Sequence, residues 1–278
     1  MRTQIGARTD VGRIRGNNED SSKFVPELNL FVLSDGMGGE AHGEVASKMA
    51  VEGIVAHCVE AEKDPSMPFC GEPRPDLSPK TNRLISAVRL ANRKIYETAR
   101  DNPTHRGMGA TVVAVWADEL RMSLVHVGDS RAYLLRAGEL LQLTEDHSLV
   151  AEQVRRGILT QQQADRSDMQ SVLTRALGIE EEVEVDADEQ MLMDGDTVLL
   201  CSDGLNRMVT DPEVASTLLT SNGLQPAADR LVELANDYGG EDNSTVVLFR
   251  VQLRGDGLVA RLWRWLNEPI ESTSPKGG

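Results

Sequence analysis

An apolar run that stops at an acidic, glycine-rich corner most constrains how this chain folds. Residues 28–34, LNLFVLS, have the character of a buried strand, and Asp35 opens the segment DGMGGEAHGEVAS that follows. Gly36, Gly38, Gly39 and Gly43 permit backbone conformations that side chains forbid and let carbonyl groups approach an ion closely. The corner is therefore either an ordinary turn from a strand to a helix or a position that presents a carboxylate to a metal ion.

Similar acidic corners recur along the chain. Glu19 and Asp20 lie in RGNNED, Asp129 in HVGDSR, Asp203 in CSDGL and Asp242 in GGEDNS. Each alone is typical of a turn aspartate that caps its own backbone. If their strands belong to two packed sheets, however, the strand ends converge at one rim and gather charges that need compensation. Oxygen ligands without an accompanying His or Cys cluster suit Mg²⁺ or Mn²⁺ rather than zinc.

The hydrophobic pattern predicts an α+β fold. Strand-like runs joined by short turns indicate antiparallel neighbours, and they cover residues 28–34, 110–116, 121–127, 131–135, 139–143, 197–202 and 244–253. Four helices are predicted, the first two from apolar positions at the 3.6-residue period, over residues 44–58, 82–99, 211–219 and 225–238. Strands and helices in blocks, rather than in strict alternation, favour helices packed on antiparallel sheets.

Composition limits the class of protein. The 278 residues, 40% of them hydrophobic, are enough for one large domain with a substantial core. The formal charge of −15 argues against a nucleic-acid or anionic-membrane surface. Three cysteines without a CxxC pair indicate neither a disulfide framework nor a thiolate zinc site. No apolar run approaches the roughly 18 residues that span a bilayer, so we expect a cytoplasmic protein without a transmembrane segment.

Two segments differ from the rest of the chain. The polar stretch 148–177 has the pattern of a small helical excursion between strands, which is either a lid beside a site or a plain surface insertion. Residues 254–278 combine a short amphipathic segment, which carries Trp263 and Trp265, with a disordered end. We expect that segment to dock on a domain formed by residues 1–253, with a partner or membrane-surface contact as the alternative.

Paired carboxylate-bound cations suit one reaction class well. Such ions polarise a shared water and stabilise the attacking and leaving oxygens of an in-line displacement at phosphorus. Phosphate monoesters hydrolyse so slowly in water that enzymes supply up to about 10²¹-fold. Arg15, four residues before Glu19, offers a planar fork for two phosphate oxygens, or else it pairs with an acidic neighbour at the surface.

Eight short motifs follow one another between Thr9 and Val251: RGNNED, DGMGG with GEVAS, GMGATVV, HVGDSRAYLLR, LTEDHS, VLTRALG, CSDGL and GGEDNSTVV. In this order they closely resemble the metal-dependent protein serine/threonine phosphatases of type 2C, bacterial branch. The resemblance implies hydrolysis of phosphoserine and phosphothreonine in proteins by a metal-bridging water, without a phosphoenzyme. It also implies a central β-sandwich of two antiparallel sheets flanked by helices, in four α-β-β-α layers, with residues 148–177 as a flap.

The resemblance implies roles for particular residues in holding two Mn²⁺ or Mg²⁺ ions. Asp35 would bridge both ions. Asp203 and Asp242 would hold one of them, and Glu19 with the Gly36 carbonyl would hold the other, through water in places.

Further roles follow from the same resemblance. Asp20 would support this shell of ligands, Asp129 together with Asp203 would form a weaker third metal site, and Arg15 would bind the substrate phosphate. The expected partners are phosphorylated protein substrates and a cognate serine/threonine kinase. We expect no nucleic-acid partner and a monomer.

One departure from the family leaves the general acid open. Eukaryotic relatives have a histidine after the DG pair, where this chain has Met37, and methionine cannot donate a proton. Our hypothesis is that a metal-bound water protonates the leaving group. His42 and His147 are the alternatives, although each is more typical of a structural histidine.

Two rival interpretations also remain. CSDGLNR, residues 201–207, has the CxxGxxR spacing of cysteine-dependent phosphatases, although Asp203 within that loop would repel both a thiolate and a phosphate. No helix start is predicted close behind it, since Pro212 lies five residues beyond Arg207. The second rival is a non-catalytic relative that binds phosphorylated partners, which the presence of every expected acidic position disfavours.

Overall fold

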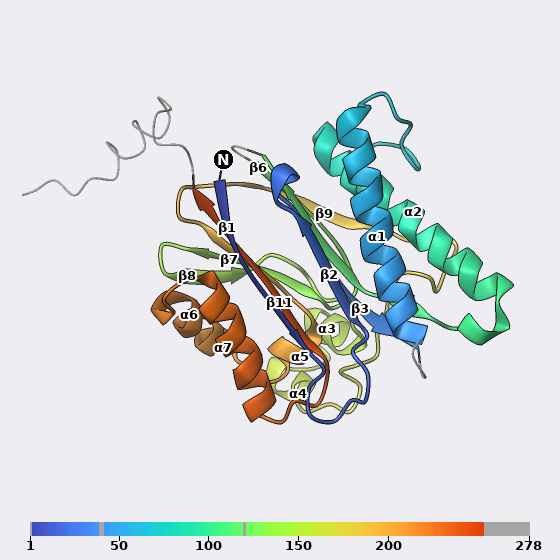
Figure 1. Ribbon diagram of the computed structural model, residues 1–278. Helices are drawn as coiled ribbons and strands as arrows, with labels where there is room; N and C mark the ends of the chain where they lie inside the picture. Colours follow the sequence, from blue (N-terminus) through green and yellow to red (C-terminus); the bar gives the residue numbers. More distant parts are fainter. Residues whose placement is uncertain (1, 39–41, 119–120, 253–278) are drawn as a thin grey trace, which may run out of the picture.

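Two antiparallel β-sheets stack face to face at the centre of the molecule (Figure 1). The computed structural model describes residues 2–38, 42–118 and 121–252. One sheet has the order β1-β11-β10-β7-β8, and the other has the order β2-β3-β5-β6-β9 with the short β4 paired to β3. The strands are β1 (Arg2–Asp10), β2 (Asp20–Val25), β3 (Leu30–Met37), β4 (Gly109–Ala110), β5 (Val112–Ala117), β6 (Arg121–Val127), β7 (Arg131–Arg136), β8 (Glu139–Gln142), β9 (Asp186–Met191), β10 (Thr197–Cys201) and β11 (Ser244–Gln252).

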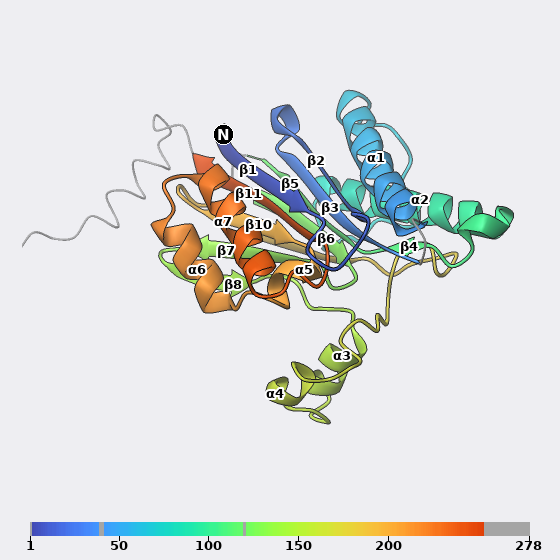
Figure 2. The ribbon, with the colours of Figure 1, turned by 60° about the horizontal axis from the view of Figure 1, so that its bottom comes forward.

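Helices lie outside the two stacked sheets. They are α1 (His42–Lys63), α2 (Pro79–Asp101), α3 (Leu149–Arg155), α4 (Gln161–Ala164), α5 (Asp203–Asn206), α6 (Asp211–Thr220) and α7 (Leu224–Asp237), with single 3₁₀ turns at Pro26–Leu28 and Pro103–His105. Helices α1 and α2 lie on the sheet that contains β3, and α6 and α7 lie on the sheet that contains β11 (Figures 1 and 2). The predicted α+β sandwich with four α-β-β-α layers is confirmed.

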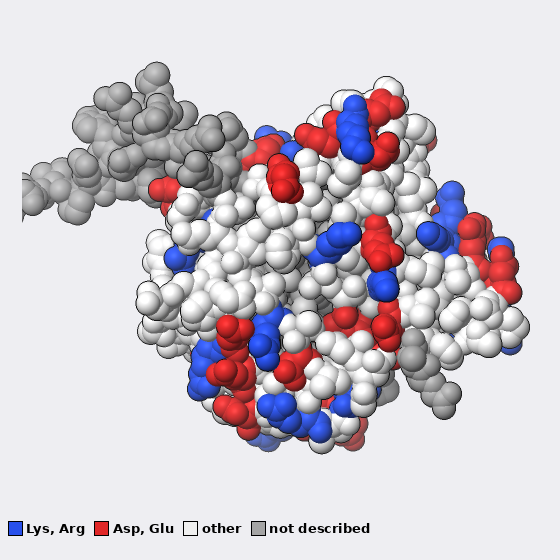
Figure 3. Space-filling view, viewed as in Figure 1, with Lys and Arg blue, Asp and Glu red and all other residues white. Residues whose placement is uncertain are grey.

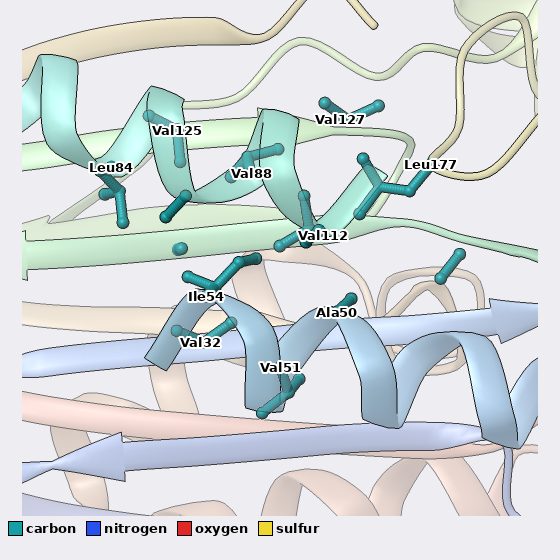
Figure 4. Close-up of a cluster of buried hydrophobic side chains, with 14 of the residues drawn as sticks. Val32, Ala50, Val51, Ile54, Leu84, Val88, Val112, Val125, Val127 and Leu177 are labelled. Carbon is teal, nitrogen blue, oxygen red and sulfur yellow. The ribbon is translucent and has the colours of Figure 1, made fainter. Parts of the chain in front are cut away.

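Three apolar clusters fill the spaces between these layers. Figure 4 shows one of them, in which Ile54 of α1 and Leu84 of α2 pack with Val32 of β3. Between the two sheets, the rings of Phe31 and Phe249 stack with their centroids 4.1 Å apart. The third cluster joins the β11 sheet to α6 and α7. Because each sheet is covered on both faces, its central strands are buried on both sides and have nearly continuous apolar sequences.

The four predicted helices are present; α1 and α2 extend beyond their predicted bounds at both ends, and α6 and α7 match theirs to within one residue. Helix α2 begins at Pro79 because the Ser78 hydroxyl accepts a hydrogen bond from the Thr81 N–H, and proline suits the first helical position. Three strands were not predicted: β1, β2 and β9. All three lie at sheet edges, where one face is solvated and the sequence is correspondingly polar.

Leu177, the last residue of the predicted excursion 148–177, is buried in the apolar cluster of α1 and α2. Residues 148–173 form a small helical unit that stands apart from the sandwich (Figure 2). It contains α3 and α4, and its base is closed by a bridge between Ser148 and Leu173 and by a 2.9 Å hydrogen bond from the Thr174 N–H to the His147 carbonyl. We call this unit the flap. The predicted amphipathic segment and tail, residues 254–278, lie outside the described residues.

Candidate metal centre

One cavity of about 430 Å³ at the rim of the sandwich collects almost all of the predicted site residues. They come from different elements: Asp35 lies near the end of β3, Asp129 between β6 and β7, Asp203 at the start of α5 and Asp242 just before β11. The lining of the cavity includes Arg15, Glu19, Asp35, Gly36, Asp129, Asp203 and Asp242. The acidic corners therefore converge as expected for ends of strands in two stacked sheets.

The glycine-rich corner after β3 is needed for close approach. A Cβ atom on Gly36 would collide with the Gly43 carbonyl, and one on Gly43 would collide with the carboxylate of Glu19. The Gly36 N–H donates to the Glu19 carbonyl at 3.1 Å, and the Ser47 hydroxyl donates to the same oxygen at 2.6 Å. Because these two residues have no Cβ atom, the start of α1 and the loop before β2 can pack closely against the backbone that follows Asp35.

Asp20 lies behind the cavity rather than in its lining. It is paired with Asp35 across β2 and β3. Its Oδ2 atom accepts hydrogen bonds from the Ser202 hydroxyl at 2.7 Å and the Thr245 hydroxyl at 2.6 Å. These bonds link the edge strand of one sheet to β11 of the other sheet and to Ser202, which directly follows β10, a placement that suits the predicted supporting role.

Four buried carboxylates at the centre have raised pKa values. Burial, followed by the charges of the neighbouring carboxylates, raises the pKa of Asp35 well above its usual value. Burial is also the main cause that raises the pKa of Asp20 to about 7 and that of Asp129 to about 8. The pKa of Asp203 is raised by burial, although Arg207 opposes the shift. Buried like charges of this kind require a positive counter-charge before all of them ionise.

The donor atoms of the cluster fit hard divalent cations. All of the candidate side-chain ligands are carboxylate oxygens, which Mg²⁺ and Mn²⁺ prefer. Asp20 Oδ1 and Asp203 Oδ1 are buried and have no hydrogen-bond partner among the described residues. Unpaired buried oxygens are costly in a folded protein, so these atoms are suited to direct or water-mediated contact with a cation.

Two arginines flank the carboxylates. Arg15 Nη2 lies 2.8 Å from Asp242 Oδ2, and its side chain is 55% exposed. Both sequence-based roles of Arg15 are thus compatible with its position, since it pairs with an acidic neighbour and lines the cavity. Arg207 Nη2 lies 2.6 Å from Asp203 Oδ2 and 3.6 Å from Asp129 Oδ2. Arg207 was not predicted as a site residue; its spacing of four from Asp203 was the available signal.

Other residues of the cavity were also missed. The Asn243 amide oxygen accepts the Glu19 N–H at 2.7 Å, while its NH₂ group donates to the Val11 and Asn17 carbonyls, each at 2.9 Å. Asn243 therefore fixes the loop that carries Glu19. Ser171 and Leu173 bring the flap to the cavity lining.

The structure argues against residues 201–207 as the loop of a cysteine-dependent phosphatase. Cys201 is the last residue of β10 and is fully buried. Burial raises the pKa of its thiol to about 12, so a reactive thiolate is disfavoured. The expectation that no helix begins nearby was wrong, because α5 starts at Asp203; its four residues place a carboxylate, not a phosphate cradle, at that end.

The two histidine alternatives for the general acid do not line the cavity. His147 stacks on His126 with ring centroids 4.7 Å apart, and its Nε2 lies 3.3 Å from Asp186 Oδ2 and 3.1 Å from Arg175 Nη1. His126, His147 and Asp186 offer ligand atoms within 4.8 Å of one another, but the Arg175 guanidinium already pairs with Asp186 there. His42 makes an edge contact with the ring of His105.

The fold and the cavity together define a candidate carboxylate metal centre between two β-sheets. The family model described as protein phosphatase 2C matches residues 16–242. Serine/threonine phosphatase stp of Listeria welshimeri is 38% identical over 253 residues, which are 90% of this chain and 96% of that protein. The chain therefore belongs to the protein phosphatase 2C family.

Solved structures agree with this assignment. The crystal structure of the Mycobacterium tuberculosis serine/threonine phosphatase PstP/Ppp has a TM-score of 0.79 at 37% identity and covers 91% of this chain and 100% of that chain. The catalytic domain of PstP in complex with two manganese ions has a TM-score of 0.74 at 38% identity and covers 90% of this chain and 98% of that chain. The predicted family and enzyme class are thereby confirmed.

Within the described part of the chain, none of the helices has both the length and the apolar character needed to cross a membrane.

Proposed function

We propose that this chain hydrolyses phosphoserine and phosphothreonine in proteins with the help of two divalent ions, Mn²⁺ or Mg²⁺, and so reverses a serine/threonine kinase. The observation that carries the proposal is the convergence of Asp35, Asp203 and Asp242 in one cavity of a protein phosphatase 2C chain. When bound, the ions would supply an activated water and neutralise the charge that develops on the phosphoryl group. The buried carboxylates offer oxygen ligands to such cations, and their negative charge would repel free anions from the same position.

The proposed ligand set follows the positions of the carboxylates. Asp35 lines the same cavity as Glu19, Asp203 and Asp242 and would bridge both ions. Asp203 and Asp242, which both adjoin strands of the β11 sheet, would hold one ion. Glu19 and the Gly36 carbonyl would hold the other, and the Gly36 N–H, which donates to the Glu19 carbonyl, keeps the two residues together.

Arg15 would bind the substrate phosphate. Its guanidinium is half-exposed at the cavity and held by the single carboxylate of Asp242. Because a guanidinium offers several parallel donors, Arg15 has donors left for phosphate oxygens. Recognition must be local, since the chain carries a formal charge of −15. Figure 3 shows acidic and basic side chains interspersed on the face viewed, which does not favour long-range attraction of phosphate.

We also propose several finer assignments, which come from the composition of the sequence, from its family resemblance or from its departure from the family at Met37. They are a cytoplasmic location, a monomeric state, the choice between Mn²⁺ and Mg²⁺, a weaker third ion at Asp129 and a metal-bound water as the general acid. The position of Met37 in the cavity lining supports the last of these, because its thioether cannot donate a proton.

The proposal is tested by following phosphate release from a phosphothreonine peptide with and without Mn²⁺, and then after chelation. We expect release that needs the ion and stops with the chelator. An Asp76→Asn variant is the matched control, because Asp76 is an exposed carboxylate paired with Arg74 outside the cavity. Release that continues in metal-free buffer would reject the proposed chemistry.

A further inference from the structure

Arg207 places a fixed positive charge between two carboxylates of the metal centre. Its Nη2 atom lies 2.6 Å from Asp203 Oδ2 and 3.6 Å from Asp129 Oδ2. The side chains of Asp203 and Asp129 are only 11% and 8% exposed, and that of Arg207 is 23% exposed. One nitrogen therefore bridges two buried carboxylates that come from different elements of the fold.

The backbone of a short helix places Arg207 next to one of these carboxylates, that of Asp203. Asp203 is the first residue of α5 and Arg207 caps its C-terminal end, and the Arg207 N–H donates to the Asp203 carbonyl at 3.0 Å. Residues four apart on a helical turn lie on the same side of it, so the guanidinium returns directly to the Asp203 carboxylate. The contact is built into a single helical turn.

The bridged pair is the one that the family resemblance assigns to a weaker third ion. A guanidinium remains charged at every relevant pH and presents only donors. A divalent ion between Asp129 and Asp203 would need the same carboxylate oxygens, and it would meet the positive charge of Arg207 at close range. The arginine and a third ion are therefore alternatives at this position.

We propose that Arg207 is a built-in cation at the outer position of the metal centre, which lets the enzyme bind two ions and keeps a third from binding tightly. The inference rests on the proposed function, because it leaves the unpartnered Oδ1 atom of Asp203, together with Asp35, Asp242 and Glu19, to hold the two remaining ions. Arg207 acts here through Asp129 and Asp203, as a positioning residue.

The number of Mn²⁺ ions bound by the full chain tests this inference. Equilibrium dialysis, with the free ion followed by its electron paramagnetic resonance signal, gives stoichiometry and affinity without any substrate. We expect two tightly bound ions in the wild type. Arg207→Met keeps much of the side-chain length but removes the charge, and it should bind a third ion about tenfold more tightly or better than the wild type does.

Two further variants identify the origin of such a change. Adding Asp129→Asn to Arg207→Met should abolish the gained third ion, because one of its ligands is lost. Arg121→Met removes the same charge from a surface pair with Glu189 and should leave the stoichiometry at two. Circular dichroism of each variant establishes that it is folded before ions are counted.

The possible results separate this inference from the proposed function. A wild type that binds three ions tightly, with a third affinity unchanged in Arg207→Met, overturns the role of Arg207 while metal-dependent hydrolysis stands. A wild type that binds no Mn²⁺ and releases no phosphate overturns both. A third ion gained in Arg207→Met and lost again with Asp129→Asn supports the inference.

Discussion

At the scale of single residues, the centre is built from side chains that are unfavourable without a cation. Asp35 is surrounded by carboxylates from both sheets, and burial together with these charges raises its pKa well above the usual value. Asn has nearly the same shape as Asp but carries no charge. Replacing one carboxylate therefore removes a metal ligand and relieves repulsion at the same time.

Asp35→Asn should consequently separate activity from stability. We expect Mn²⁺-stimulated hydrolysis of a phosphothreonine peptide to fall by about 10³-fold or more, because the proposed bridging ligand is lost. The metal-free protein should melt at an equal or higher temperature than the wild type. Steady-state kinetics and thermal melts in chelator measure the two effects. A variant that keeps its Mn²⁺-stimulated turnover would remove Asp35 from the site.

The buried thiol gives a second prediction at this scale. Cys201→Ser should keep turnover within about twofold of the wild type, since the thiol is fully buried and its pKa is raised to about 12 by burial. Stability should fall by about 1–3 kcal/mol, because a hydroxyl replaces the thiol in an apolar environment. Denaturant melts and the peptide assay measure these changes. A folded variant without activity would restore the thiolate interpretation.

At the scale of elements, the flap is joined to the metal centre through His147. The backbone N–H of His147 donates to the Gly128 carbonyl at 3.0 Å, and the backbone N–H of Gly128 donates to the ring nitrogen Nδ1 of His147 at 3.1 Å. The His147 carbonyl accepts the Thr174 N–H at the other end of the flap. Because Gly128 precedes Asp129, one histidine connects both ends of the flap to the loop of a candidate ligand.

This connection should weaken in acid. Burial, then the charges of His126 and Arg175, lower the pKa of His147 to about 4, while Asp186 opposes the shift. The folded state therefore favours the neutral ring, whose stabilising contribution is complete above the unfolded value near 6.5 and is lost as pH falls towards 4. His147→Asn keeps an acceptor for the Gly128 N–H but does not titrate.

Thermal melts at pH 7 and pH 5 in chelator test this effect. The wild type should lose more stability than His147→Asn between the two pH values, and the comparison cancels titration of the acidic cluster and of His126, which both proteins share. Equal losses in the two proteins would show that His147 does not contribute to the acid sensitivity.

The elements also show how far the sequence predicts this fold. The amphipathic periods of α1 and α2 and the apolar runs of β3 and β10 are local signals, and their predictions were correct. Strand β9, DADEQM, has no such signal in its sequence. Its extended conformation depends on pairing with β6, which is distant in the sequence. The cluster around His147 and the contact of Arg207 with Asp129 join residues distant in sequence, so no local pattern could reveal them.

At the scale of the whole molecule, the metal centre lies where the two sheets meet. Asp35 belongs to β3 of one sheet, whereas Asp203 and Asp242 adjoin β10 and β11 of the other. The same strands β3 and β11 supply the stacked rings of Phe31 and Phe249 between the sheets. The apolar core thus sets the distance between carboxylates that repel one another, and a cation held by both sides would join the sheets.

Binding of Mn²⁺ should therefore stabilise the entire domain rather than one loop. At a free ion concentration of about 100 times Kd, a single site that exists only in the folded state adds about 2.7 kcal/mol to the free energy of unfolding. We expect Mn²⁺ to raise the melting temperature as one cooperative transition and a chelator to reverse the rise. Because cation binding and proton release from the carboxylates are linked, the rise should be larger at pH 8 than at pH 6. The Asp76→Asn control should behave like the wild type, whereas Asp35→Asn should lose most of the rise. An unchanged melting temperature in saturating Mn²⁺ would contradict a cation held between the two sheets.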